Sequence, residues 1–134
     1  MRFSISRIVL IAWFIFLVSC GKDESEIIPT KWEGQEVDFQ KDFTTQKDGN
    51  ETLILHQKSK EPFEGKIERN GTAYSTVQNF EEGKLNGKSV KKSKDGSWVE
   101  ANYKNGKLNG DLIFFSKEGK KRSVLKYRNG VLIK

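Results

Sequence analysis

The sequence predicts an all-β protein, an antiparallel array of β-hairpins that follows a signal peptide and a flexible tether. Three observations predict this fold. A segment of the second half is duplicated, glycine-containing turn pairs recur at hairpin intervals, and the runs between them alternate apolar and polar residues. Helix is disfavoured after residue 60, because glycine costs about 1 kcal/mol in a helix interior and glycines recur from Gly65 to Gly130.

The first 19 residues have the three parts of an export signal. Arg2 and Arg7 precede the apolar run 8–18, and the small Ser19 stands before Cys20, the only cysteine. The run is shorter than the roughly 20 residues that a membrane-spanning helix needs. We therefore expect residues 1–19 to be a signal peptide, with an uncleaved signal anchor or a chance cysteine after an ordinary signal as alternatives.

The segment Leu17-Val18-Ser19-Cys20 resembles the lipobox of bacterial lipoproteins. The resemblance implies that Cys20 becomes the new N-terminus and carries acyl chains, palmitate among them, that anchor the protein to a membrane. Gly21 stands where lipoproteins retained at the inner membrane have aspartate, which favours the outer membrane. Lys22-Asp23-Glu24 is similar to an export signal of surface lipoproteins, with an ordinary solvated spacer as the alternative. The expected location is the bacterial cell envelope, as an outer-membrane lipoprotein on the periplasmic face or the cell surface.

Residues 20–35 are expected to form a lipidated flexible tether, and residues 36–134 the repeat domain. No second cysteine is present to form a disulfide bond. Charge is divided along the chain: residues 20–82 carry a net charge of −6 and residues 83–134 a net charge of +10. Such asymmetry influences which partners associate with the protein, and it does not determine the fold.

The second half contains an internal duplication. The segment 80–87 recurs 23 residues later as 103–110, and its opening returns at 127–130. A degenerate earlier copy begins at Pro62-Phe63-Glu64-Gly65. The residues that define the repeat are Phe80, Gly83, Gly87, Gly96, Tyr103, Gly106, Gly110, Gly119, Tyr127 and Gly130.

Five turn pairs separate the expected strands: Asn70-Gly71, Asp95-Gly96, Asn105-Gly106, Glu118-Gly119 and Asn129-Gly130. Asn-Gly and Asp-Gly favour primed hairpin turns, and connections this short join antiparallel neighbours. Alternation places Val99, Ala101 and Tyr103 on one face, and Leu108, Leu112 and Phe114 on another. The run 52–55 is expected to be the strand that opens the sheet.

Residues 52–134 resemble MORN repeats, in particular the bacterial variant with a Tyr-x-x-Gly-x-x-x-Gly motif and a following glycine turn. Tyr103, Gly106, Gly110 and Gly119 form the best copy, whereas Phe80 replaces tyrosine in the copy before it. The resemblance implies a hairpin array that acts as a binding module. Some members of this variant are classed as antitoxins, so an antitoxin-like or immunity role is the alternative function.

The expected strands have two faces that differ in side chains. Phe80, Tyr103 and Tyr127 are expected to form an aromatic ladder in the core, or a row that binds sugars or bases. A second set points to the opposite face, where an exposed apolar binding patch is expected. Its alternatives are a two-sided core or coverage by the segment 32–55. This second set comprises Trp98, Ile113, Phe115 and Val124.

No pattern of catalytic or metal-binding residues is recognisable. His56 is the only histidine, and the expectation is a bystander at a strand end, with a hydrolase built around it as the alternative. The run 48–51 is too short for a calcium loop, and Glu81-Glu82 are adjacent strand residues that point to opposite faces. We therefore expect no cofactor, no metal and no enzymatic activity.

Basic residues of the repeats are candidate contacts to an anionic partner, or lysines that keep exposed strands soluble. The expected function is therefore a non-catalytic, lipid-anchored envelope protein whose repeats bind a protein or an anionic envelope polymer. The membrane is a partner through the N-terminal lipid, and nucleic acid is excluded by the expected compartment. The candidate contacts are Lys84, Lys88, Lys91, Lys92, Lys107, Lys120, Lys121 and Arg122.

Overall fold

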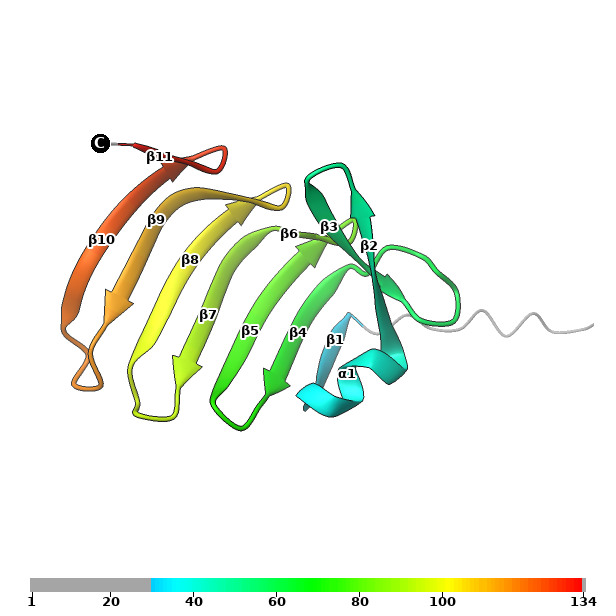
Figure 1. The fold of residues 1–134 in the computed structure, drawn as a ribbon, viewed down its shortest axis with the longest axis horizontal. Coiled ribbons are helices and arrows are strands. Elements are labelled where there is room, and N and C mark those ends of the chain that lie inside the picture. The colour runs from blue at the N-terminus through cyan, green and yellow to red at the C-terminus, as the bar shows by residue number, and fades with distance from the viewer. Residues whose placement is uncertain (1–29, 134) are drawn as a thin grey trace, which may run out of the picture.

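The protein is mostly β-structure, built on one open sheet (Figure 1). The computed structural model describes residues 30–133, so the expected signal peptide, the expected lipidation site Cys20 and most of the expected tether lie outside the described residues. The sheet has nine strands in the order β1-β4-β5-β7-β8-β9-β10-β11, with β6 paired to β5. All its neighbours are antiparallel except β1 and β4. The structure confirms that the fold is mostly β with antiparallel hairpins, and it adds one short helix.

The elements follow one another closely along the chain. Their bounds are β1 Lys31–Gln35, α1 Glu36–Asp42, β2 Phe43–Asp48, β3 Glu51–His56, β4 Gly65–Asn70, β5 Tyr74–Glu81, β6 Lys84–Leu85, β7 Gly87–Ser93, β8 Trp98–Lys104, β9 Lys107–Phe115, β10 Lys121–Arg128 and β11 Val131–Ile133.

The last residues of the expected flexible tether are ordered. Residues 31–35 are strand β1, which pairs in parallel with β4, and α1 follows at once. The reason is Trp32, whose Nε1 donates a 2.7 Å hydrogen bond to the Asp42 carboxylate. Its ring contacts Phe39 and Phe43 edge-on, each at 5.7 Å between ring centroids. The contacts among Trp32, Phe39 and Phe43 thus order a segment that is polar in composition.

The run 52–55 does not open the large sheet as expected. It belongs to β3, which pairs with β2 in a separate two-stranded sheet, and β1 occupies the edge of β4 instead. This β2–β3 hairpin is attached to the large sheet through backbone hydrogen bonds. Ile54 N–H donates to the Gly83 carbonyl at 2.8 Å, and Phe63 N–H donates to the Ile54 carbonyl at 2.9 Å.

The main core lies at the N-terminal end of the sheet. It consists of the buried Phe39, Phe43, Phe63, Ile67 and Phe80, with Trp32, Ile54 and Leu85 packed against them. Phe63 lies between Phe43 and Phe80, at 5.0 and 6.1 Å between ring centroids. Helix α1 and β2 therefore cover the face of β4 and β5 that carries Ile67 and Phe80. We call this side of the sheet the core face.

The core face continues along the uncovered strands. In the register of β8 and β9, Val99 faces Phe114, Ala101 faces Leu112, and Tyr103 faces Leu108. Directly opposite residues share a face, so the expectation that these two sets lie on different faces is wrong. All six belong to the core face. Val99 is opposite Lys91, and Lys91 is opposite Thr76. Thr76 shares a face of β5 with Phe80, because the two residues are four positions apart on the same strand.

Trp98, Ile113, Phe115 and Val124 lie on the other side, called here the opposite face, as predicted. Trp98 pairs with Phe115 and Ile113 pairs with Val124, and the rings of Trp98 and Phe115 stack at 4.7 Å. Coverage of this face by the segment 32–55 is not found, since that segment packs on the core face.

Hairpin turns occur at all five predicted pairs, but only two of these have the primed geometry. Primed turns need positive φ at both central residues. Asn105 and Gly106 have φ of 49° and 78°, and Asn129 and Gly130 have 49° and 83°. Asn70-Gly71 and Asp95-Gly96 depart from this expectation. In the latter loop, the Asp95 carboxylate accepts hydrogen bonds from the backbone and hydroxyl of Ser97, which stabilises a wider turn.

The repeat-defining aromatic residues occupy equivalent register positions. Each stands opposite a glycine on one neighbouring strand and a leucine on the other side. The triplets are Gly65–Phe80–Leu85, Gly87–Tyr103–Leu108 and Gly110–Tyr127–Leu132.

The aromatic ladder does not form as a stack of touching rings. Phe80, Tyr103 and Tyr127 share the core face, but each is two strands from the next, which is about 10 Å in a sheet. Among residues 30–133, the ring contact of Phe80 is with Phe63. The leucines stand between the aromatic residues, so the row is a mixed apolar one.

Candidate functional site

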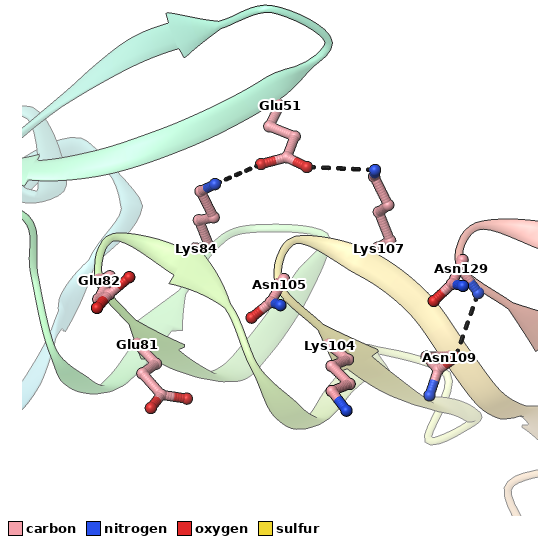
Figure 2. Close-up of a pocket in the computed structure, with 9 residues that line it drawn as sticks. All are labelled: Glu51, Glu81, Glu82, Lys84, Lys104, Asn105, Lys107, Asn109 and Asn129. Carbon is pink, nitrogen blue, oxygen red and sulfur yellow. Dashed lines mark hydrogen bonds and ion pairs between the residues drawn. The ribbon is translucent and has the colours of Figure 1, made fainter.

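A polar groove lies beside three turns of the chain (Figure 2). These turns, at Glu82-Gly83, Asn105-Gly106 and Asn129-Gly130, form what we call the turn row. The groove has a volume of about 770 Å³. Its lining residues are Glu51, Glu81, Glu82, Lys84, Lys104, Asn105, Lys107, Asn109 and Asn129.

Backbone hydrogen bonds hold consecutive turns against each other. Gly106 N–H donates to the Leu85 carbonyl and Gly130 N–H donates to the Leu108 carbonyl, both at 2.8 Å. Asparagine side chains add a second contact at each step. The backbone N–H of Asn105 donates to Oδ1 of Asn86 at 3.3 Å, and that of Asn129 donates to Oδ1 of Asn109 at 3.2 Å. The wall of the groove is therefore a regular, rigid row.

Glu51 connects the β2–β3 hairpin to this row. Its carboxylate lies 2.7 Å from Nζ of Lys84 and 3.5 Å from Nζ of Lys107 (Figure 2). The hydrogen bond to Lys84 holds the pKa of Glu51 below its ordinary value and raises the pKa of Lys84. The two lysines each follow a turn glycine, at equivalent positions of the duplication. One carboxylate thus joins two repeat units to the hairpin.

This ion pair predicts a specific pH dependence of stability. The pKa of Glu51 is lowered in the folded chain, so its contribution is present above the unfolded value of about 4.3 and is lost as the pH falls through the folded pKa. The Glu51→Gln variant should be less stable than the wild type at pH 7, and the difference should shrink at pH 3. Urea unfolding at the two pH values measures this.

A control variant separates this effect from general acid destabilisation. Glu64 is exposed, and none of the ion pairs within residues 30–133 involves it. Glu64→Gln should keep the wild-type dependence on pH. A Glu51→Gln variant with the same pH dependence as the wild type would show that the ion pairs of Glu51 with Lys84 and Lys107 contribute nothing to stability.

The polar groove carries balanced charges and no grouping typical of catalysis. Its three carboxylates are matched by three ammonium groups, and it contains no histidine. His56 lies elsewhere, 8% exposed, with its ring edge-on to Phe43 at 5.8 Å between centroids. Within residues 30–133, no group of three or more His, Cys, Asp and Glu side chains is placed to hold a metal ion.

The predicted basic contacts do not gather into one patch. Lys84 and Lys107 pair with Glu51, and Lys88 pairs with Glu100 at 2.8 Å, on the opposite face. Lys91 stands on the core face, with Nζ 3.8 Å from the ring centroid of Tyr74. The remaining four belong to the opposite face or to the end of the sheet away from the turn row. They are Lys92, which faces Trp98, Lys121, which faces Phe115, and the adjacent Lys120 and Arg122.

A second groove runs across the core face where no described element covers it. It has a volume of about 320 Å³, and it combines apolar side chains of β8 and β9 with polar ones of β5 and β7. Burial raises the pKa of Tyr103, at one side of this groove. The lining residues are Thr76, Gln78, Ser89, Lys91, Val99, Ala101, Tyr103, Leu112 and Phe114.

The fold defines a class, an open-sheet and mostly antiparallel β protein, whose surface carries these two grooves. Comparison with known proteins adds no family to this description: no family model, no curated protein and no solved structure matches the chain. The described part of the chain has no helix with the length and hydropathy needed to cross a membrane.

Sequence reasoning identified some residues of these sites and missed others. Lys84, Lys91 and Lys107 were named as candidate contacts, and Tyr103 as a repeat residue. Glu51 and Thr76 were not singled out. The only signal for Glu51 in the sequence is that it is an acidic residue at a hairpin tip. Thr76 has no local signal, because only its burial in the folded chain distinguishes it from other threonines.

Proposed function

We propose that this chain is a non-catalytic, lipid-anchored protein of the bacterial envelope whose MORN-like hairpin repeats present a binding surface for a protein or an anionic polymer. One observation carries the binding part of the proposal. The core face keeps Val99, Leu112 and Phe114 partly exposed beyond the elements that cover β4 and β5. A sheet face with apolar side chains and no covering layer is typical of an interaction site.

The features of the two grooves support binding over catalysis. In the polar groove, Glu51 is paired with Lys84 and Lys107, and the Oδ1 atoms of Asn86 and Asn109 accept hydrogen bonds from the backbone of the next turn. The single histidine packs among the aromatic rings of the core. Neither groove joins a nucleophile to a general base at hydrogen-bond distance, the arrangement that covalent catalysis uses.

A protein is better supported as the partner than an anionic polymer. A polymer would need a continuous row of available cations, whereas Lys84, Lys88 and Lys107 are engaged with carboxylates. The core face instead offers a contiguous mixed surface of apolar and hydrogen-bonding side chains. Such a composition is typical of the central part of protein interfaces.

The anchor part of the proposal depends on the sequence. Residues 1–19 are removed, Cys20 is acylated, and the residues up to β1 connect the lipid to the folded domain. Two or more acyl chains make attachment long-lived, since each buried methylene contributes about 0.8 kcal/mol. The protein then acts at the outer membrane, on its periplasmic face or at the cell surface.

Radiolabelled palmitate and cross-linking test both parts in the bacterium that makes the protein. The wild type should incorporate the label and form a discrete cross-linked adduct with an envelope protein. The Cys20→Ser variant should lose the label and the adduct together. Equal labelling of the variant would contradict the anchor, and a labelled wild type without any adduct would contradict the binding role.

A further inference from the structure

The groove on the core face changes in character from one side to the other. Its rows follow the strand register, in which Thr76 faces Lys91, Lys91 faces Val99, and Val99 faces Phe114. The side formed by β5 and β7 is polar, and the side formed by β8 and β9 is apolar. A complementary ligand must therefore present a polar group next to an apolar one.

Thr76 is an unusual residue of this groove. It is only 8% exposed, and its hydroxyl oxygen is buried without a hydrogen-bond partner among residues 30–133. A buried hydroxyl without a partner costs free energy, because it has lost its water and gained no replacement. Thr76 lines the groove, but its hydroxyl oxygen is itself buried, so contacts to a ligand must come from the other polar side chains of this side.

Lys91 supplies the charge next to Thr76. It is the only charged side chain that lines the groove, and no carboxylate lines it. The acidic residues of β8 and β9, Glu100 and Asp111, face Ile113 and Lys126 on the opposite face. The Lys91 ammonium lies over the Tyr74 ring and pairs with no carboxylate within residues 30–133. The polar side of the groove is thus complementary to a carboxylate.

We propose that this groove binds a partner protein by an apolar side chain placed next to a carboxylate. The apolar side chain packs on Val99, Leu112 and Phe114. The carboxylate pairs with the ammonium of Lys91, which is exposed and lines the groove. This inference rests on the proposed function, and it specifies the face and the chemistry of the partner.

A protein fits this groove better than a small molecule or a second copy of the chain. A small ligand is usually enclosed over most of its surface, and an open sheet face cannot enclose it. Residues 83–133 hold 13 Lys and Arg against 4 Asp and Glu. Two copies of the chain that met through this half would therefore repel each other. An acidic partner removes this repulsion.

Two adjacent phenylalanines give a matched test in the bacterium that makes the protein. Phe114 lies on the core face and Phe115 on the opposite face of the same strand, and both are partly buried. Each is replaced in the full chain by the photoreactive p-benzoylphenylalanine. Irradiation should give a discrete protein adduct from position 114 and none from position 115. The cross-linked segment of the partner should contain Asp or Glu within a few residues of the modified apolar residue.

Substitution of Lys91 tests the carboxylate. Lys91→Gln should lower the adduct yield from position 114 by about fivefold or more, the factor expected when a charge-assisted hydrogen bond is lost. Lys92→Gln, on the opposite face of the same strand, should leave it unchanged. Circular dichroism and a melting curve establish that each variant is folded.

The other outcomes separate this inference from the proposed function. An adduct only from position 115 would keep a protein-binding role and overturn the groove. An adduct from position 114 that is a second copy of the chain, or that is insensitive to Lys91→Gln, would overturn the partner chemistry. The absence of any protein adduct from both positions would overturn the inference and the binding role together.

Discussion

Replacing Phe63 by alanine should reduce the free energy of unfolding by about 3–5 kcal/mol, the usual cost of removing a buried phenylalanine ring. Phe63 is fully buried, and its ring contacts those of Phe43 and Phe80. It joins the β2–β3 hairpin to β5, so the cavity would open between two sheets. A small domain is stable by about 5–15 kcal/mol, and this loss is a large part of the total.

Urea unfolding followed by circular dichroism measures the effect of Phe63→Ala. Val37→Ala is the control, because Val37 is 81% exposed and its truncation should change stability by less than about 0.5 kcal/mol. A loss below about 1 kcal/mol for Phe63→Ala would mean that the cluster collapses around the missing ring and does not determine how the hairpin packs.

The C-terminal two thirds of the sheet could be predicted from local signals. Glycine pairs mark the turns, alternation marks the strands, and the duplication shows that both recur in register. Strands β7 to β10 follow from these signals alone, because each contacts mainly its sequence neighbours. When each element contacts mainly its neighbours in the sequence, the local sequence pattern is sufficient to predict the fold.

The N-terminal part could not be predicted in the same way. Strand β1 and α1 lie in a segment with few apolar residues, and their order depends on contacts between residues distant in sequence. Trp32 pairs with Asp42, and the parallel pairing of β1 with β4 spans more than thirty residues. Neither contact has a periodic signature, so composition suggested a tether.

The candidate sites were predictable in part, for a related reason. Basic residues are visible in a sequence, but which of them are paired is not. Lys84 and Lys107 are engaged by Glu51, a residue of a hairpin that the local pattern placed in the wrong sheet. Which face an alternating strand presents to the core also depends on where α1 and β2 pack. The core-face groove therefore emerged only with the three-dimensional structure.

Replacing Gly65 by alanine should destabilise the protein by about 3 kcal/mol, because backbone strain and a direct clash act together. Gly65 has a φ of +130°, a conformation that side chains disfavour. A Cβ built there would lie 2.0 Å from the carbonyl oxygen of Thr30. That oxygen accepts a 2.8 Å hydrogen bond from Lys66 N–H, which positions β1 on the edge of β4.

The clash should first displace β1, and this gives the variant a local signature. Hydrogen exchange at the amide of Lys66 should accelerate more than exchange at amides of β8 and β9, because β1 is held at one edge of the sheet and the later hairpins contact each other. Trp32 would leave the core with β1, so protection in α1 should fall as well.

Gly87→Ala is the matched control for strain without a clash. Gly87 has a φ of +83° and faces Tyr103, but a Cβ there would meet no atom within 4 Å. This variant should lose about 1 kcal/mol, the lower end for an alanine held at positive φ. Equal losses for the two variants would show that the Thr30 contact is unimportant, and that the parallel strand β1 is not what makes glycine necessary at position 65.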